Sequence, residues 1–551
     1  MHHRIPVWII SLIAAGLLAS CGGGSPDSPS SPAPRLLAST AFASSFGVTE
    51  AGGYLTVDTG SGLVFKVKQS NGDITSIRYK GGTELQGQSK GSHIASGIGA
   101  VVSYTVNGSV AQITLTTPTL VHYLLVREGD NTIYMGTYVT AEPSVGELRW
   151  ITRLNSNAFP NAPAESDLRG NTGAIESSDI FGMPDGTTRS KYYGNQRAMD
   201  LSVRGVSGPT VGVYMVYGNR ESSSGGPFHR DIQNQTGSDA EVYNYMNSGH
   251  NQTEAWRMGF HGPYALMFTD GQTPTAPDMS WMENQNLSGW VPASQRGKVT
   301  GNGLFGFDML HQYVVGFAND TAQYWTVAKA PNGNFSMPAM KPGTYTMTVY
   351  KDELGIYSES VTVTSGATTA LPVRMLTGDP DKTPAVWRIG TWDGKPTEFL
   401  NGPAITLRHP SDPRNASWGP VTYAIGAPFN TFPAAQWKSG INQPTKVTFT
   451  LTPEQVTDHT IRIGLTAAYN GGRAQITVNN WTSPAFATST QPKSRSITIG
   501  TYRGNNVTYT YAVPASAFAA GTNTLTINVI SGTAGSDFLS PAYAYDAVDM
   551  L

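Results

Sequence analysis

The chain has 551 residues, which is too many for one compact domain and predicts three or four domains of roughly 150 residues each. With 61 glycines, 35 prolines and only 13% charged residues, the composition excludes a helical bundle or coiled coil. The 39% of hydrophobic residues excludes wholesale disorder and leaves a turn-rich, mainly β protein. The net charge of −2 provides no overall field to attract nucleic acid, and a single cysteine excludes an internal disulfide.

The N-terminal part predicts a signal peptide over residues 1–20 and a Gly/Ser/Pro-rich linker over residues 21–39. The apolar run after Arg4, about fifteen residues long, is short for a membrane-spanning helix and typical of a signal-peptide core. It ends in Leu18-Ala19-Ser20-Cys21, which resembles a bacterial lipoprotein processing site. We expect an exported lipoprotein with its lipid on Cys21, at the outer membrane or cell surface. The alternative is an ordinary secretory signal with an unrelated cysteine.

Residues 40–297 predict a large β-sandwich. Alternating apolar and polar residues or β-branched runs, separated by turn residues such as Asn71-Gly72, indicate one strand after another. The clearest expected strands are Tyr54–Asp58, Leu63–Lys68, Val110–Thr116, Leu120–Arg127 and Thr132–Thr140.

Two smaller β units follow. Residues 298–375 have the strand pattern of a small fibronectin-like sandwich, which is too small for a deep cleft. A linker rich in Asp, Pro and Thr leads to residues 385–551, whose closing strands around 523–529 and 542–545 predict an antiparallel jelly roll of the carbohydrate-binding kind.

The sequence lacks the motifs of several reaction classes. The chain has no Cys-based zinc set, no HExxH helix, no phosphate-cradling GxxxxGK[ST] loop and no Gly-x-Ser-x-Gly elbow. A glycosidase needs two carboxylates that face one bond. Glu142, Glu147 and Glu176 are candidates, but single carboxylates on strand edges are usually solvated, and we expect these to be so.

Basic and aromatic residues are dense between Arg149 and Tyr264, although the chain as a whole is slightly acidic. Guanidinium groups pair with carboxylates, and tyrosine rings stack on pyranose faces. Any one of these residues could be a surface charge or a buried ring. The set as a whole favours a site for an anionic sugar.

Several long strings in this stretch and beyond it resemble the rhamnogalacturonan lyases of polysaccharide lyase family four. The strings include GELRW, TRSKYYGNQR, GGPFHRDI, YNYMNSGHNQTE, MKPGTYTM, IGTWDGKPTEF and HPSDPRNASWGP. The resemblance implies a galactose-mutarotase-like sandwich, a fibronectin type III-like domain and a carbohydrate-binding-like jelly roll, in that order. Fungal members of the family carry disulfides, which this chain lacks.

The resemblance implies a rhamnogalacturonan endolyase that cleaves the rhamnose–(1→4)–galacturonate bond of rhamnogalacturonan I by β-elimination. Removal of the C5 proton adds charge beside a carboxylate, so the reaction needs a neutralising cation, a base and a donor to the leaving oxygen. By motif matching, Lys191 is the expected base, His250 the expected donor and Arg149 the substrate-binding cation, with Tyr243 and Tyr245 as aromatic contacts. The roles of Lys191 and His250 could be reversed.

A lysine acts as a base only when neighbouring cations or burial lower its pKa. Arg149, Arg153 and Arg189 are the expected neighbours of Lys191. We expect His229 and His93 to have structural roles.

For the cofactors, the resemblance implies that arginine and lysine replace a catalytic metal ion. A structural calcium near Asp546 of the jelly roll is the one metal considered. We expect a monomer whose partner is rhamnogalacturonan I. The alternatives left open are a noncatalytic pectic-glycan-binding surface lipoprotein and a mutarotase-like sugar epimerase.

Overall fold

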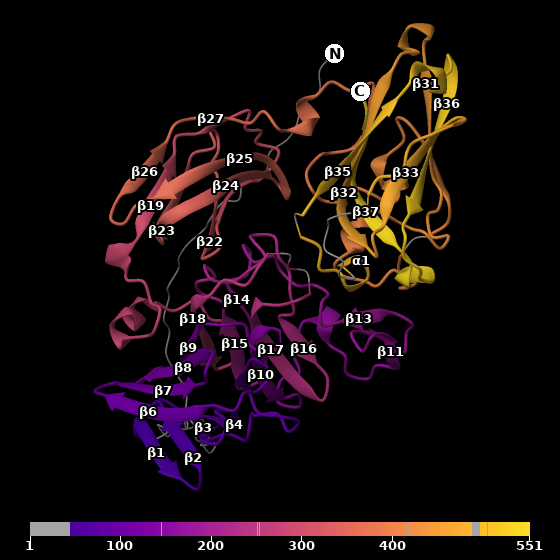
Figure 1. Cartoon of the computed structure of the whole chain (residues 1–551). Helices are drawn as coiled ribbons and strands as arrows, with labels where there is room; N and C mark the ends of the chain where they lie inside the picture. The colour runs from indigo at the N-terminus through magenta and orange to yellow at the C-terminus, as the bar shows by residue number, and fades with distance from the viewer. Residues whose placement is uncertain are drawn as a thin grey trace, which may run out of the picture. The chain divides into compact units, whose positions relative to one another are not determined.

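The computed structural model describes residues 44–144, 146–250, 252, 254–415, 418–487, 496–503 and 505–551, which belong to one compact unit. The predicted signal peptide, the linker and Cys21 lie outside the described residues. Strands and turns make up nearly all of the described chain (Figure 1), so the mainly β fold is confirmed. Among the described residues, no helix has both the length and the hydropathy needed to cross a membrane.

The first domain is built on a seven-stranded antiparallel sheet with the order β14-β15-β18-β9-β8-β7-β6. These strands are β14 (Val203–Ser207), β15 (Gly212–Val216), β18 (Gly259–Thr269), β9 (Thr132–Val139), β8 (Leu120–Arg127), β7 (Val110–Thr116) and β6 (Val101–Asn107).

Two four-stranded sheets complete the sandwich. One has the order β1-β2-β3-β4 and the other β16-β17-β10-β5. The first contains β1 (Gly47–Ala51), β2 (Tyr54–Asp58), β3 (Leu63–Lys68) and β4 (Ile74–Tyr79); the second contains β16 (Asn234–Thr236), β17 (Asp239–Asn247), β10 (Leu148–Asn155) and β5 (His93–Ile94).

The core of this domain joins the large sheet to both smaller ones. Alternate residues of β7 are buried, as expected for a strand with one face on a core. One hydrophobic cluster contains Val57 of β2, Ile113 of β7, Trp150 of β10 and Val242 of β17, all fully buried. The even-numbered residues of β10 and β17 therefore point into the sandwich, which leaves the odd-numbered residues for the opposite face.

A small three-stranded sheet, β11-β12-β13, projects from the first domain and leads to Lys191. Its strands are β11 (Gly173–Glu176), β12 (Ile180–Gly182) and β13 (Thr188–Ser190). The tight turn between β11 and β12 contains Ser177 and Ser178, both in the left-handed region with φ of 47° and 57°. Because Ile180 pairs with Ser190, Asp179 and Lys191 emerge together at the same end of the β12–β13 pair.

The middle domain packs two main sheets around a core of its own. A two-stranded parallel sheet of short strands, β20 and β27, is also part of this domain. The strands are β19 (Gly297–Gly301), β20 (Leu304–Phe305), β21 (Tyr313–Ala318), β22 (Gln323–Val327), β23 (Phe335–Met340), β24 (Gly343–Lys351), β25 (Leu354–Val363), β26 (Thr368–Leu371) and β27 (Arg374–Met375).

The C-terminal domain is a sandwich of two five-stranded sheets. The first contains β28 (Trp387–Gly390), β37 (Ala542–Met550), β32 (His459–Tyr469), β35 (Val507–Val513) and β30 (Ala435–Trp437). The second contains β29 (Val421–Ala424), β31 (Thr445–Leu451), β36 (Gly521–Ile530), β33 (Arg473–Val478) and β34 (Trp481–Thr482). Every residue of β37 is buried, because this central strand has another layer on each face. A single helical turn, α1 (Ser496–Ile499), follows residues outside the described part.

Candidate active site

The outer face of the β10–β17 pair carries three of the predicted site residues. In the antiparallel register Arg149 is opposite Tyr245, and Ile151 is opposite Tyr243. Since side chains alternate along a strand, these odd-numbered residues share one face. The rings of Tyr243 and Tyr245 are stacked, with centroids 5.8 Å apart and an interplanar angle of 18°. The sequence pattern and the strand period thus bring Arg149, Tyr243 and Tyr245 together.

The Arg149 guanidinium is held by several neighbours. It donates to the Tyr245 hydroxyl and, over 2.7 Å, to Ser96 Oγ, and it forms an ion pair of 3.1 Å with Glu147. Its carbon Cζ lies 5.4 Å from the centre of the Tyr245 ring. Only 20% of its side chain is exposed. The guanidinium is therefore fixed on the tyrosine face and remains partly exposed.

Lys191 reaches the site from the end of β13. Its Nζ lies 2.7 Å from Asp179 Oδ1 and 5.6 Å from the centre of the Tyr192 ring. The expected arginine neighbours have other partners: Arg153 pairs with Glu241 at 3.1 Å, and Arg189 donates to the Asp167 carbonyl. The immediate partner of Lys191 is thus a carboxylate, which sequence reasoning missed.

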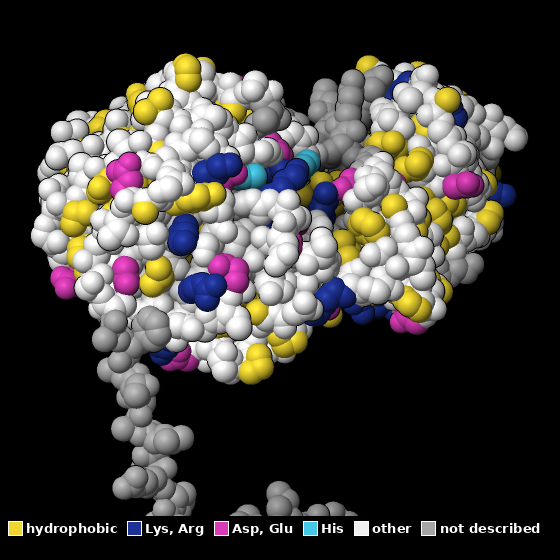
Figure 2. All heavy atoms as spheres, turned by 90° about the horizontal axis from the view of Figure 1, so that it is seen from below, with side chains coloured by type: hydrophobic (Ala, Val, Ile, Leu, Met, Phe, Trp, Pro, Cys, Tyr) yellow, Lys and Arg dark blue, Asp and Glu magenta, His cyan; other side chains and the backbone are white. Residues whose placement is uncertain are grey.

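His250 lies in the loop after β17 and is oriented by a buried carboxylate. Its Nδ1 lies 2.8 Å from Asp231 Oδ1, and 24% of the His250 side chain is exposed. Tyr192 packs edge-on against the imidazole with ring centroids 5.4 Å apart, and the Tyr245 ring lies 5.2 Å away. Tyr192 thus contacts both Lys191 and His250. Figure 2 shows Lys, Arg and His side chains gathered at a hollow of the surface.

Charge and burial act in opposite directions on the His250–Asp231 pair. Burial favours the neutral imidazole, but the negative charge of Asp231 outweighs it, and the pKa of His250 lies above its ordinary value of 6.5. Burial also disfavours the Asp231 carboxylate, yet His250 and His229 hold the pKa of Asp231 far below its usual range. The contact with Asp231 therefore stabilises the protonated imidazole against the effect of burial.

The remaining candidates have structural contacts. His93 is buried, and its Nε2 lies 3.0 Å from a guanidinium nitrogen of Arg153. His229 is buried with Nε2 3.3 Å from Asp231 Oδ2. The expectation of a solvated carboxylate is wrong for Glu176, which is 4% exposed, because residues of the C-terminal domain cover it. That contact spans 233 residues and leaves no local signal in the sequence.

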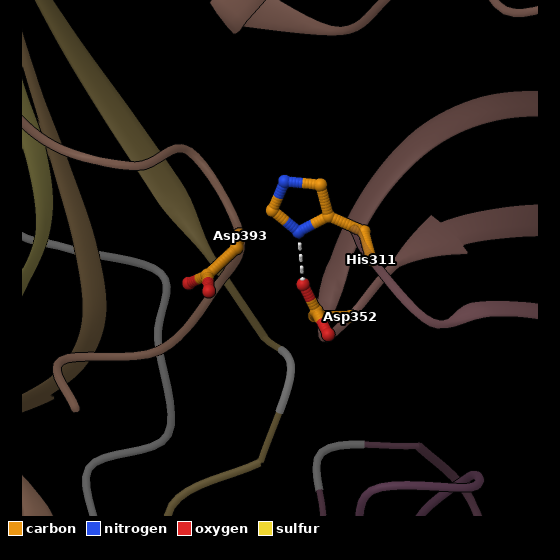
Figure 3. A group of neighbouring side chains, drawn as sticks. All are labelled: His311, Asp352 and Asp393. Carbon is orange, nitrogen blue, oxygen red and sulfur yellow. Dashed lines mark hydrogen bonds and ion pairs between the residues drawn. The ribbon is translucent and has the colours of Figure 1, made fainter. Parts of the chain in front are cut away.

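A second cluster, away from this face, has the composition of a metal site. Ligand atoms of His311, Asp352 and Asp393 lie within 4.8 Å of one another (Figure 3). However, Lys395 Nζ lies 3.3 Å from Asp352 and 3.1 Å from Asp393. One ammonium group thus already lies between the two carboxylates, at the place where a metal ion would bind. We interpret the cluster as a charge network between the middle and C-terminal domains.

Asp546, the residue predicted to lie near a structural calcium, is in a buried acidic environment. Its Oδ1 accepts backbone N–H groups of Asp393 and Gly394, while its Oδ2 is buried without a hydrogen-bond partner. Burial and the nearby Asp393 and Glu398 carboxylates raise the pKa of Asp546 well above its ordinary value. Burial raises the pKa of Glu398 to about 7, with a further contribution from Asp393. Oxygen donors with an excess of negative charge are the set that calcium prefers.

Comparisons with known proteins cover nearly all of the described chain. Residues 46–289 match the family model described as rhamnogalacturonan lyase B, N-terminal. Residues 282–371 and 385–550 match domain II and domain III of polysaccharide lyase family 4.

Curated relatives from fungi match over most of their length. A probable rhamnogalacturonate lyase A of Aspergillus terreus is 48% identical over 506 residues, which are 90% of this chain and 94% of that protein. Rhamnogalacturonate lyase A of Aspergillus aculeatus is 45% identical over 92% of this chain and 96% of its own length. The protein of the same name from Emericella nidulans is 44% identical, with the same coverage.

The Asp231→Asn variant tests the electrostatics of the imidazole. Removing the negative charge leaves burial as the main influence, so the pKa of His250 should fall below its wild-type value. An NMR titration of the His250 ring protons measures this shift. Asp270→Asn, which removes an exposed carboxylate paired with Lys80, should leave the titration unchanged. An unaltered His250 titration in Asp231→Asn would contradict the assignment.

Proposed function

Since this chain belongs to polysaccharide lyase family 4, we propose that it cleaves the rhamnose–(1→4)–galacturonate bond of rhamnogalacturonan I by β-elimination. The enzyme class rests on the family and on relatives named rhamnogalacturonate lyase. One observation supports the proposed cleavage site and mechanism: Lys191 and His250 both contact Tyr192, beside Arg149 and the stacked tyrosines.

Arg149 binds and neutralises the galacturonate carboxylate in this proposal. Loss of the C5 proton moves negative charge onto that carboxylate, so a fixed cation beside it stabilises the transition state more than the ground state. The contacts of Arg149 with Tyr245, Ser96 and Glu147 support this role, because they hold the guanidinium before substrate arrives. The stacked Tyr243–Tyr245 pair supplies aromatic surface beside it.

His250 donates a proton to the departing O4 oxygen. Its raised pKa favours this role, since the ring keeps its proton to a higher pH than an ordinary histidine does. Asp231 binds Nδ1, so the other ring nitrogen, Nε2, is the donor to the leaving group. As pH rises through the His250 pKa, the ring loses the proton that it donates, so kcat should fall on the alkaline side of the pH–rate profile.

Lys191 removes the C5 proton. It enters as one half of an ion pair, so its ammonium group must first transfer a proton to the Asp179 carboxylate, 2.7 Å away, before the neutral amine accepts the C5 proton. The partial exposure of Lys191, 23% of its side chain, lets a sugar ring reach the amine. The product is a 4,5-unsaturated galacturonate at the new non-reducing end.

Lys191→Ala and His250→Ala should each lower the rate of product formation by about 10²-fold or more. The rate is followed through the ultraviolet absorbance of the unsaturated uronate on rhamnogalacturonan I, with homogalacturonan as the control substrate. Lys80→Ala, which replaces an exposed lysine, should keep the wild-type rate. Wild-type rates in either site variant would refute the assigned residues.

We also propose that catalysis needs no metal ion and that a structural calcium is held by Asp546, with Glu398 and Asp393 beside it. The neutralising charge in the reaction comes from Arg149. The calcium would neutralise the buried carboxylates of the C-terminal domain and stabilise its fold. The buried, unpartnered oxygen of Asp546 supports this assignment.

Chelation separates the two metal proposals. After treatment with EDTA, millimolar calcium chloride should raise the melting temperature, because a ligand of the native state stabilises it. Initial rates on rhamnogalacturonan I at 25 °C should be the same with and without calcium. Activity that is lost to EDTA and regained with calcium would contradict the metal-free mechanism. A melting temperature that does not respond to calcium would contradict the structural site.

Finally, we propose that the protein is an exported bacterial lipoprotein, anchored at the outer membrane or cell surface through Cys21. The signal-like segment and the Leu18-Ala19-Ser20-Cys21 string support this. Two or more acyl chains would anchor it stably.

Substitution of the anchoring residue tests the localisation. The wild-type protein should partition into the detergent phase, and the mass of its N-terminal peptide should show an acylated Cys21. Cys21→Ser should partition into the aqueous phase. A mature wild-type chain that retains residues before Cys21, or carries no lipid, would exclude the anchor.

A further inference from the structure

The C-terminal domain binds the strands that lead to Lys191. Asp412 is 2% exposed, and its Oδ2 accepts both the backbone N–H and the hydroxyl of Thr188 in β13, each over 2.7 Å. The backbone N–H of His409 donates to the same hydroxyl over 3.2 Å. Hydrogen bonds from Thr188 and from Arg414 hold the pKa of Asp412 below its usual range against the effect of burial. Thr188 is three residues before Lys191.

A second contact holds the turn that carries Asp179. The Glu176 carboxylate at the end of β11 meets His409 Nε2 at 3.0 Å and the Thr498 hydroxyl at 3.1 Å. The backbone N–H of Ser411 donates to His409 Nδ1 over 3.1 Å. A nitrogen that accepts this bond has no proton of its own, so the hydrogen-bond pattern places the ring proton on Nε2, facing Glu176. Asp179 follows three residues after this carboxylate.

The chain on the other side of Lys191 is bound as well. The Tyr193 hydroxyl donates to the Thr498 carbonyl over 2.7 Å, and the Gly194 N–H donates to the Thr406 carbonyl over 2.9 Å. Ile499 joins Tyr192 and Tyr245 in the hydrophobic cluster beneath the site. The C-terminal domain therefore contacts the chain before Lys191, the turn that carries its ion-pair partner, and the chain after it.

We propose that the C-terminal domain is a structural part of the active site, and that Asp412 is a positioning residue for Lys191. The inference rests on the proposed function, in which Lys191 is the base. A hairpin of three short strands has little core of its own. The buried Asp412–Thr188 and Glu176–His409 contacts supply the fixation that proton transfer at a defined carbon requires, since displacement of a catalytic group by about 1 Å costs on the order of 10²-fold in rate.

The test compares kcat and KM of four variants on rhamnogalacturonan I, well below each variant's unfolding temperature. Asp412→Ala removes the acceptor of both Thr188 bonds. Thr188→Val removes only the hydroxyl, and Thr188→Ser restores it. Lys395→Met is the matched control, because it breaks the charge network with Asp352 on another surface of the same domain.

Asp412→Ala should lower kcat at least about tenfold, with KM within about twofold, because positioning acts on the chemical step. Thr188→Val should lower kcat by a smaller factor, and Thr188→Ser and Lys395→Met should keep the wild-type kcat. Hydrogen exchange of the amides in 176–191, followed by mass spectrometry, should be faster in Asp412→Ala and unchanged in Lys395→Met. Wild-type kcat or unchanged exchange in folded Asp412→Ala would overturn the inference, as would an equal loss of kcat in Lys395→Met.

The two readouts separate this inference from the proposed function. If the wild-type protein forms no unsaturated uronate, or if Lys191→Ala keeps full activity, the proposed function fails. If the wild type is active and Lys191→Ala is not, but Asp412→Ala has the wild-type kcat, the positioning role alone fails. The exchange measurement does not depend on any substrate, so in either case it tests whether the Asp412–Thr188 contact holds the strands before Lys191.

Discussion

The candidate site depends on the pairing of three partly exposed cations with carboxylates. Arg149, Lys191 and His250 have Glu147, Asp179 and Asp231 at 3.1, 2.7 and 2.8 Å. An unpaired cation in such a place would pay a large desolvation penalty or lose its charge. Pairing allows the protein to keep three cations together before an anionic sugar arrives. The net charge of −2 therefore says little about the local field that a substrate meets.

The same pairing gives the two proton-transfer residues different surroundings. His250 has a fully buried partner that is itself fixed by His229, so its imidazolium is stabilised within the protein. Lys191 has a partner at the tip of a tight turn, with 16% of the Asp179 side chain exposed, so water reaches this ion pair. In the proposed mechanism His250 is the donor and Lys191 the acceptor, and the two carboxylates differ in burial in the same order, with 6% of the Asp231 side chain and 16% of the Asp179 side chain exposed.

Local sequence patterns predicted the strands well and the site only in part. The ranges expected for Leu63–Lys68 and Leu120–Arg127 match β3 and β8, because period-two alternation directly reflects one buried face. The same periodicity explains why Arg149, Tyr243 and Tyr245 meet. Asp179 and Asp231 were missed because they belong to a turn and a loop. In such segments the spacing of residues along the sequence does not predict which way a side chain points. The Thr188–Asp412 bond spans 224 residues, and the expectation of a solvated Glu176 failed for the same reason.

The long sequence span of the Thr188–Asp412 bond also sets an order in which parts of the site become available. Domains fold as units, beginning with the N-terminal one, so the sandwich with its arginine and stacked tyrosines can form early. The hairpin before Lys191 meets Asp412 only after more than two hundred further residues have been made, and it meets Thr498 later still. In the proposed mechanism, the position of Lys191 therefore depends on the part of the chain that is made last. A chain that stops before its final domain would contain Arg149 and both tyrosines but would lack Asp412 and Thr498, which hold the hairpin before Lys191.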